Sequence, residues 1–232
     1  MTSIFYFGKQ FSCNCCGCSF RKFKPKGNGL VERENAQCPY CGSLERTRLL
    51  LFYLRNETKL FSENVKLLHF APEWSLYPIF KKAKNIEYFA VDLNPVLADQ
   101  VVDIMAIPFA DNSFDFIICS MVLGFVSDEP KAIKEMLRVL KPDGMALIQT
   151  LIDLQNPHTF ETTDADTPEK RLQYYTEPDG ERLHGTDFAQ GLQTAGFQVE
   201  TIDYAAQLGD DWHQKYALGN GCRELIFQCT KG

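Results

Sequence analysis

Apolar residues between positions 101 and 152 form two continuous runs separated by a stretch with helical spacing. Residues 114–120 (FDFIICS) are almost continuously apolar, which is typical of a parallel strand covered on both faces. From Glu129 onward, apolar residues recur at helical spacing with charged residues between them. We expect residues 141–144 (KPDG) to end this helix in a turn and residues 145–152 to form the next strand. The pattern predicts half of a doubly wound α/β sheet.

Two more apolar runs precede this unit, at residues 66–70 (KLLHF) and 86–91 (IEYFAV), and residues 74–84 between them have helical spacing. Ligands of open α/β sheets bind outside the carboxyl ends of the strands, so the loops there are the first place to look for function. Asp92 closes the second run. It lies roughly 20 positions beyond the first, where a carboxylate can accept hydrogen bonds from both ribose hydroxyls in nucleotide-binding folds. The alternative is an Asp that caps the turn DLNP.

Three segments of this region resemble class I S-adenosylmethionine-dependent methyltransferases. They are residues 68–73 (LHFAPE), 103–115 (DIMAIPFADNSFD) and 138–144 (RVLKPDG). The resemblance extends over about residues 66–204. It implies an α/β fold with a Rossmann-like, mostly parallel sheet whose last strand, at residues 223–230, is antiparallel. It also implies methyl transfer from S-adenosyl-L-methionine.

The resemblance assigns residues to the cofactor. Asp92 would bind the ribose hydroxyls and Asp103 the adenine amino group, since a carboxylate accepts from both. Leu93, Ile104 and Met105 would line the adenine slot. The other residues that we expect at the cofactor follow the first and fourth strands: Phe70, Ala71, Pro72, Glu73, Cys119 and Ser120. The alternative for both Asp side chains is an ordinary turn or surface role.

Two loops depart from the usual pattern of the family. Residues 70–74 (FAPEW) contain no glycine where a G-x-G turn normally brings the backbone close to the cofactor. Residues 119–125 (CSMVLGF) lack the Asn/Asp-Pro-Pro-aromatic turn used on planar exocyclic amines, so methylation of adenine or glutamine nitrogen is disfavoured. They also lack the polar residues of the family's HVLEH segment, and no catalytic residue is assigned. His158 and His184 are the remaining titratable candidates.

Six of the nine cysteines lie between positions 13 and 41. Cys13 and Cys16 form one C-x-x-C-G segment, and Cys38 and Cys41 form another. Four thiolates from two such turns match a structural tetrahedral zinc site, and we expect an N-terminal zinc ribbon with a basic hairpin at residues 19–35. The alternatives are redox-active or merely buried cysteines.

The first cysteine pair is ambiguous, because Cys15 and Cys18 also have C-x-x-C spacing. We choose Cys13 and Cys16, since only that pair is followed by glycine as the second pair is. Similar zinc-bearing methyltransferases place the first pair at the same positions. Cys119, Cys222 and Cys229 lie in expected strands, where core positions are typical.

A helix is expected to begin after the cysteines, with Ser43 as its cap, and to run to about Leu60. The expected organisation is a zinc ribbon at residues 1–42, a connecting helix at 43–62 and a methyltransferase domain at 63–232. The arginines of the helix are interpreted mainly as a solvated face. Basic residues are concentrated in this part of the chain, so a nucleic acid is a possible but not a favoured partner. The residues are Arg21, Lys22, Lys24, Lys26, Arg33, Arg46 and Arg48.

Residues 153–185 have no clean period and are expected to form a lid or substrate loop at the carboxyl edge of the sheet. Residues 176–187 resemble loosely the family segment GQxDHVRxYGxD, with Arg182, Gly185 and Asp187 matching. Asp187 has an alternative role as the cap of a helix at residues 188–195.

The composition argues against some classes of function but does not identify an activity. The chain has 232 residues, of which 45% are hydrophobic and 23% charged, and a net charge of −6. That charge argues against a broad nucleic-acid-binding surface. The start lacks the features of a secretory signal and no apolar run is long enough for a membrane span, so we expect a cytoplasmic protein with no membrane partner.

Two functions follow. The favoured one is an S-adenosylmethionine-dependent methyltransferase with structural zinc, whose acceptor is an unknown small molecule or macromolecule. The alternative is a non-catalytic zinc-ribbon module that docks nucleic acid or protein.

Overall fold

The computed structural model describes residues 4–27, 32–96, 98–219 and 221–232. The chain forms two compact units, and each combines segments distant in sequence. The first contains Met1–Asn64, Glu73–Ile86 and Asp203–Glu224, and the second contains Val65–Pro72, Glu87–Ile202 and Leu225–Gly232. This division differs from the contiguous boundaries expected from the sequence, because two later segments pack with the cysteine-rich segment and its helix.

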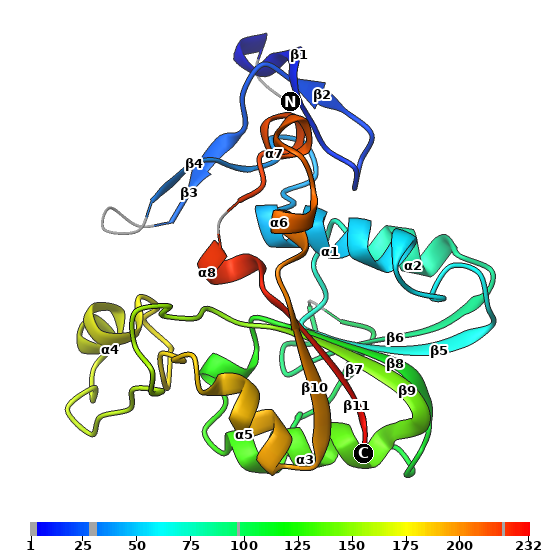
Figure 1. Ribbon diagram of the computed structural model, residues 1–232, viewed down its shortest axis with the longest axis vertical. Coiled ribbons are helices and arrows are strands. Elements are labelled where there is room, and N and C mark those ends of the chain that lie inside the picture. Colours follow the sequence, from blue (N-terminus) through cyan, green and yellow to red (C-terminus); the bar gives the residue numbers. More distant parts are fainter. Residues whose placement is uncertain (1–3, 28–31, 97, 220) are drawn as a thin grey trace. The chain divides into compact units, whose positions relative to one another are not determined.

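The second unit is built on a mostly parallel sheet of seven strands among the described residues (Figure 1). The strands are β5 (Val65–Phe70), β6 (Ile86–Asp92), β7 (Gln100–Val101), β8 (Phe114–Ser120), β9 (Leu140–Gln149), β10 (Phe197–Ile202) and β11 (Ile226–Lys231). Their order is β10-β11-β9-β8-β5-β6-β7. Strand β8 pairs in parallel with both β5 and β9. Strand β11 pairs antiparallel with β9 and β10, which confirms the expected antiparallel last strand.

Helix α3 (Glu129–Val139) confirms the helical pattern seen in the sequence. Its Ala132 and Met136 are fully buried, whereas Lys134 is exposed. The Asp128 side chain caps the helix by accepting a hydrogen bond from the Lys131 amide. Helix α5 (Phe188–Thr194) lies on the same side of the sheet (Figure 1). The apolar side chains of both helices close the core on this face.

The prediction of a turn at residues 141–144 is wrong, because these residues belong to β9. Helix α3 ends at Val139, and Leu140 already has extended backbone angles and begins β9. Pro142 favours this outcome because it pushes the preceding residue out of the helical region. The pairing of β8 with β9 shifts between Phe114–Leu140 and Phe116–Met145. The KPDG segment is therefore a bulge inside the strand.

The first unit contains four short strands and five helices among the described residues, besides a 3-10 turn at Ile4–Tyr6. They are β1 (Phe7–Ser12), β2 (Ser19–Phe20), β3 (Lys24–Lys26), β4 (Arg33–Gln37), α1 (Glu45–Asn56), α2 (Tyr77–Lys82), α6 (Tyr204–Gln207), α7 (Asp210–Tyr216) and α8 (Gly221–Glu224). Strand β1 pairs with β2, and β3 with β4. Residues 28–31 of the expected hairpin lie outside the described residues.

Helix α1 differs from its expected form in two ways. Its N-cap is Leu44, and the Ser43 hydroxyl lies 3.1 Å from the Cys13 sulfur instead of capping the helix. The solvated face expected for its arginines is wrong for Arg48, which is fully buried. That guanidinium donates hydrogen bonds to the carbonyl oxygens of Ala36 and Ser43. Burial of Arg48 removes it from the basic surface.

The segment 153–185 contains helix α4 (Pro168–Tyr175) and is attached to the sheet by an isolated bridge between Ile152 and His184. Asp187 occupies the N-cap position of α5, but its side chain makes no capping hydrogen bond. Its carboxylate accepts hydrogen bonds from the amide and hydroxyl of Thr159. Although burial opposes ionisation, these bonds lower the pKa of Asp187.

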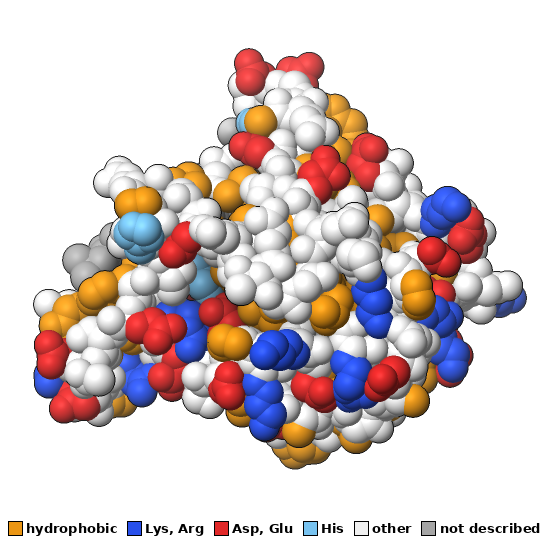
Figure 2. All heavy atoms as spheres, turned by 60° about the horizontal axis from the view of Figure 1, so that its bottom comes forward, with side chains coloured by type: hydrophobic (Ala, Val, Ile, Leu, Met, Phe, Trp, Pro, Cys, Tyr) orange, Lys and Arg blue, Asp and Glu red, His pale blue; other side chains and the backbone are white. Residues whose placement is uncertain are grey.

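Surface charges are mixed on the face shown in Figure 2, where Lys and Arg side chains lie among Asp and Glu side chains. Within the described part of the chain, no helix is long and apolar enough to cross a membrane.

Candidate functional sites

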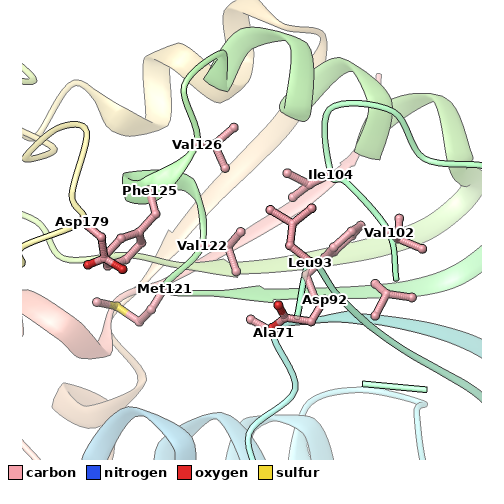
Figure 3. A pocket seen from close by; sticks show the side chains of 12 residues that line it. Ala71, Asp92, Leu93, Val102, Ile104, Met121, Val122, Phe125, Val126 and Asp179 are labelled. Carbon is pink, nitrogen blue, oxygen red and sulfur yellow. The ribbon is translucent and has the colours of Figure 1, made fainter. Parts of the chain in front are cut away.

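A pocket of about 390 Å³ opens at the carboxyl ends of β5, β6 and β8, the edge where the sequence predicted the site. Its lining is mainly apolar, with the carboxylates of Asp92 and Asp179 as its charged groups (Figure 3). The lining residues are Phe70, Ala71, Val91, Asp92, Leu93, Val102, Ile104, Met121, Val122, Phe125, Val126 and Asp179. An apolar pocket of this volume with few polar groups is typical of a small-molecule or cofactor site.

The pocket contains two residues with unusual backbone geometry. Ala71 and Met121 have φ angles of 46° and 57°, in the left-handed region that glycine normally occupies. Each directly follows a strand, β5 or β8. Ala71 is also fixed by a 2.9 Å hydrogen bond from its amide to the Val91 carbonyl. Ala71 therefore adopts, at an energetic cost, a conformation that glycine takes more easily.

The two predicted carboxylates occupy different places. Asp92 lines the pocket, whereas Asp103 does not. Asp92 Oδ1 accepts a 2.8 Å hydrogen bond from the Asn94 amide, and Asp103 Oδ1 accepts one of 2.8 Å from the Met105 amide. Both residues thus have the turn role that the sequence left open. In Asp92 that role coexists with a position in the pocket wall.

Some of the other residues predicted to bind the cofactor line the pocket, and the rest do not. Phe70, Ala71, Leu93 and Ile104 line the pocket. The remaining ones do not: Pro72, Glu73, Met105, Cys119 and Ser120. Cys119 is part of the core, and the Ser120 hydroxyl donates to Gln149 Oε1 at 3.3 Å. These two consecutive strand side chains point to opposite faces of the sheet, and their contacts with the core and with Gln149 keep both out of the pocket lining.

Sequence reasoning missed the wall formed by the segment after β8. Met121, Val122, Phe125 and Val126 face the pocket, and Asp179 joins them from the inserted segment. Figure 3 shows Asp179 beside Phe125 and Met121, on the opposite side of the pocket from Asp92. The absence of the family's usual polar residues from this loop is the signal that could have identified an apolar wall.

Arg182 fixes the loop after β8. Its guanidinium donates hydrogen bonds of 2.8 Å and 2.6 Å to the carbonyl oxygens of Leu123 and Val126, and it forms a 2.6 Å ion pair with Glu161. A Cβ on Gly185 would lie 2.5 Å from the backbone of His158, so glycine is required for this close approach. The segment 176–187, which loosely matches the family motif, therefore holds the loop that forms the pocket wall.

The two histidine candidates have different environments. The His158 side chain is 84% exposed and lies 3.7 Å from Asp187. His184 is buried, and its ring contacts Thr150 and Glu129 through its two nitrogen atoms.

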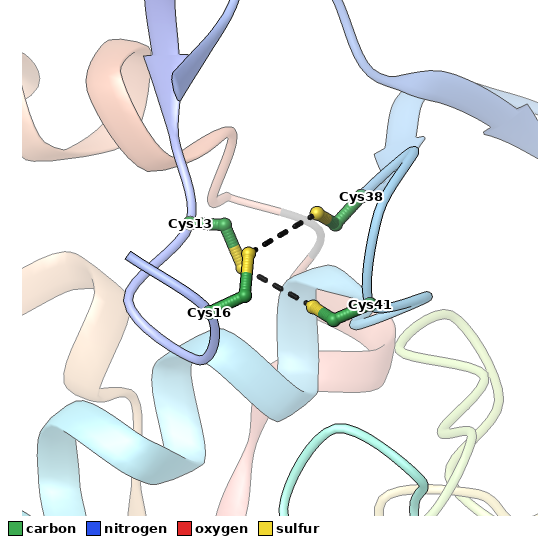
Figure 4. A group of neighbouring side chains, drawn as sticks. All are labelled: Cys13, Cys16, Cys38 and Cys41. Carbon is green, nitrogen blue, oxygen red and sulfur yellow. Dashed lines mark hydrogen bonds between the residues drawn. The ribbon is translucent and has the colours of Figure 1, made fainter. Parts of the chain in front are cut away.

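A cluster of four sulfur atoms lies in the first unit. The sulfur atoms of Cys13, Cys16, Cys38 and Cys41 lie within 4.8 Å of one another (Figure 4). Cys13 and Cys41 sulfurs are 3.5 Å apart, and Cys16 and Cys38 sulfurs are 3.8 Å apart. Zinc–sulfur bonds of about 2.3 Å in a tetrahedron separate sulfur atoms by about 3.8 Å, so the donor set fits zinc.

The cluster is formed by two matching turns. Gly17 and Gly42, which follow the two cysteine pairs, have φ angles of 72° and 76°. Their amides donate to the carbonyl oxygens of Cys13 and Cys38 at 2.8 Å and 3.0 Å. The structure thus brings together the pairs chosen from the sequence.

Cys15 and Cys18 are not part of this group of four sulfur atoms. The Cys15 thiol lies 3.6 Å from Asn14 Oδ1, and the Cys18 thiol lies 3.7 Å from the Cys16 carbonyl. Hydrogen bonds from Cys15 and the clustered thiols lower the pKa of Cys13, whereas the contact with Cys13 raises the pKa of Cys16. The pKa of Cys41 is also lowered, to about 7, whereas that of Cys38 is raised, so a bound cation would be needed to favour the thiolate form of all four.

Comparisons with known proteins agree on a methyltransferase domain. Residues 77–148 match the methyltransferase domain family. The biotin biosynthesis bifunctional protein BioHC of Cellvibrio japonicus is 34% identical over 145 residues, which cover 59% of this chain and 27% of that protein. The ubiquinone/menaquinone biosynthesis C-methyltransferase UbiE of Haemophilus ducreyi is 52% identical over 42 residues, covering 18% of this chain and 16% of that protein.

A third relative is the malonyl-acyl-carrier-protein O-methyltransferase of Halorhodospira halophila, 27% identical over 86 residues, or 31% of this chain and 29% of that protein. The chain therefore covers only between 16% and 29% of the length of these three relatives.

Solved structures support the fold. The cyclase SpnF matches with a TM-score of 0.56 and 18% identity, over 82% of this chain and 83% of that one. The YcgJ protein of Bacillus subtilis matches with a TM-score of 0.54 and 17% identity, over 79% of this chain and 98% of that one. At such identities the likeness shows a shared fold alone. Residues 77–148 thus resemble a methyltransferase domain, and the sheet of the second unit has a Rossmann-like fold.

Proposed function

We propose that this protein is an S-adenosyl-L-methionine-dependent methyltransferase. The observation that carries the proposal is the apolar pocket at the carboxyl ends of β5, β6 and β8, which has Asp92 in its wall. The match of residues 77–148 to methyltransferase domains supports the same activity. When bound, the cofactor supplies a methyl group on a positively charged sulfur atom.

The pocket residues fit different parts of this cofactor. Asp92 would accept hydrogen bonds from the ribose hydroxyls through its free oxygen, because Oδ1 is already bonded to the Asn94 amide. Leu93 and Ile104 would cover the adenine ring, and the 67% exposure of Leu93 leaves its side chain available for stacking. Asp103 would receive the adenine amino group.

The opposite wall would stabilise the cationic part of the cofactor. Asp179 is the charged group there, and a carboxylate attracts a sulfonium or ammonium group. The left-handed turn at Ala71 brings the backbone at the end of β5 close to the pocket. Met121 and Phe125 would exclude water from the transferred methyl group, which leaves positioning as the main contribution of this wall.

Titration calorimetry with S-adenosylmethionine and S-adenosylhomocysteine tests the proposal. We expect micromolar binding of both, with heat at one site per chain. Binding of neither would overturn the proposed activity and leave the non-catalytic binding module.

We also propose a structural zinc ion on Cys13, Cys16, Cys38 and Cys41. The support is the agreement between their sulfur separations and a tetrahedral site, together with the two matching turns. With four protein ligands such a site has no open position for catalysis. Its contribution would be to stabilise the small strands β1 to β4, which bury few apolar side chains.

A further inference from the structure

A small hollow lies beside the proposed cofactor pocket. Its volume is about 20 Å³, enough for one water-sized group. Met121 and Phe125 line both cavities, so the hollow adjoins the proposed cofactor pocket at these two side chains. The rest of its wall consists of Gly124, Thr150, Leu151, Tyr175, Glu177, Gly180, Arg182 and His184.

Three polar side chains form a hydrogen-bonded series at this hollow. Thr150 Oγ1 lies 2.9 Å from His184 Nδ1, and His184 Nε2 lies 2.8 Å from Glu129 Oε1. Thr150 and His184 are only 2% and 1% exposed. Thr150 directly follows β9, His184 lies in the inserted segment and Glu129 begins α3, so three separate parts of the second unit meet here.

The direction of the hydrogen bonds follows from the donors available. An ionised carboxylate can only accept a hydrogen bond. His184 Nε2 therefore carries the proton and donates a hydrogen bond to Glu129. Arg182 Nε also lies 3.7 Å from Glu129 Oε2. Nδ1 then has a lone pair and accepts from the Thr150 hydroxyl. The lone pairs of Thr150 Oγ1 are left to accept a hydrogen bond from a group in the hollow.

Gly124 keeps the space in front of these groups open. A Cβ at this position would lie 3.8 Å from both Thr150 Oγ1 and His184 Cε1. The Arg182 carbonyl oxygen would lie at the same 3.8 Å, so a single methyl group makes ordinary contacts here and a larger side chain would occupy the hollow.

Building on the methyltransferase activity proposed above, we propose that Thr150 and His184 remove a proton from the methyl acceptor and that the acceptor is a neutral phenol. The phenolic hydroxyl donates its proton to Thr150 Oγ1, and Thr150 passes its own hydroxyl proton to His184 Nδ1. The electron pair left on the phenolic oxygen forms the bond to the methyl carbon. The bond from that carbon to sulfur breaks, and its electron pair stays on sulfur. The imidazolium is paired with Glu129.

The surroundings favour a phenol over a carboxylic acid. A carboxylic acid is already ionised at pH 7 and requires no base. It would also meet the carboxylates of Glu177 and Asp179, which line the two cavities. The apolar and aromatic side chains of Met121, Phe125 and Tyr175 suit an uncharged ring instead. Only the reacting hydroxyl fits inside the hollow itself.

The test uses catechol, 4-propylphenol and 2-naphthol as acceptors, with benzoate as the carboxylate control. Radiolabelled S-adenosylmethionine should label the phenols and leave benzoate unlabelled. Thr150→Val should lower kcat by about 100-fold or more, the usual range for general-base catalysis, and Thr150→Ser should restore most of it. Affinity for S-adenosylhomocysteine should stay within twofold in both variants.

Two readouts separate proton transfer from a structural role. In Glu129→Gln, the pH at which kcat reaches half its maximum should fall, because the imidazolium loses a neighbouring negative charge while Arg182 remains. The nitrogen-15 resonance of His184 Nδ1 should move in Thr150→Val and not in Thr150→Ser.

Each failure has a distinct meaning. If S-adenosylhomocysteine does not bind, the proposed activity itself fails. If it binds and no phenol is labelled, the acceptor class is wrong. Thr150→Val with a kcat within twofold of the wild type, or a pH profile unchanged in Glu129→Gln, would overturn the proton-transfer role.

Discussion

The guanidinium of Arg48 donates a 2.7 Å hydrogen bond to the carbonyl oxygen of Tyr216, 168 residues further along the chain. It also donates to the carbonyl oxygen of Ala217, besides those of Ala36 and Ser43. One buried side chain thus bonds four carbonyl groups from two segments of the first unit, Met1–Asn64 and Asp203–Glu224. This contact explains why residues 203–224 pack with the cysteine-rich segment.

Arg48→Leu should destabilise the protein by at least about 3 kcal/mol, because several buried carbonyl groups lose their donor. Arg48→Lys should also destabilise it, although less, since an ammonium group cannot reach all four oxygens in the planar arrangement of a guanidinium. Urea unfolding followed by circular dichroism measures both. A change below about 0.5 kcal/mol in Arg48→Leu would contradict this role.

Cys38→Ser should remove the bound zinc and partly unfold the first unit, since metal binding energy in such a small module is folding energy. Cys18→Ser is the matched control, because its thiol contacts the Cys16 carbonyl and lies outside the group of four sulfur atoms, and it should retain one zinc per chain. Metal analysis by mass spectrometry distinguishes the two. Full zinc stoichiometry in Cys38→Ser would show that the assignment of ligands is wrong.

The strands and the main helix were predictable from the sequence because each has a local signal. The run Phe114–Ser120 coincides with β8, and the helical spacing from Glu129 coincides with α3. The cysteine pairs were predictable for the same reason, since glycine follows each at the turn. The KPDG bulge was not predictable, because its conformation depends on the pairing of β9 with β8.

The pocket was only half predictable. Asp92 and Ile104 lie next to strand ends that the sequence located, whereas Asp179 reaches the pocket through the path of a long insert. The series Thr150–His184–Glu129 joins residues up to 55 positions apart, and no spacing rule connects them. Likewise, the burial of Arg48 depends on carbonyl groups that arrive from residues 216 and 217.

Substitutions at Ala71 should reveal the energetic cost of its left-handed backbone conformation. Ala71→Gly removes the strain of the left-handed region and should change the free energy of unfolding by less than about 1 kcal/mol, because the gain is offset by the flexibility of glycine when unfolded. Ala71→Val should destabilise the fold by about 2 kcal/mol or more, since a β-branched residue is poorly tolerated there. Equal stability of the two variants would contradict the strained turn.

Glu135 should make stability depend on pH. A hydrogen bond from Arg138 is the main cause of the lowered pKa of its carboxyl group. The folded pKa is below the unfolded one, so this stabilisation is complete above the unfolded value of about 4.3 and is lost as the pH falls through the folded value. The stability difference between the wild type and Glu135→Gln should therefore shrink between pH 6 and pH 3, as urea titrations at each pH would show. A difference that grows toward pH 3 would contradict the assignment.

Asp103→Ala should weaken S-adenosylmethionine binding less than a change at Asp92 does. Asp103 lies outside the pocket wall, and its loss would remove one amine contact while Leu93 and Ile104 still cover the adenine ring. Calorimetry should give a loss in affinity of about tenfold or less, the value of one hydrogen bond. A larger loss than in Asp92→Ala would reverse the proposed roles.

The affinity of Asp92→Ala for S-adenosylmethionine tests the central claim most directly. Two charge-assisted hydrogen bonds to the ribose, each worth about 1.5–3 kcal/mol, would be lost, so calorimetry should show at least a tenfold weaker affinity. Asp143→Ala is the control, since this exposed Asp is outside the pocket, and its affinity should equal that of the wild type. Unchanged affinity in Asp92→Ala would contradict the proposed cofactor site.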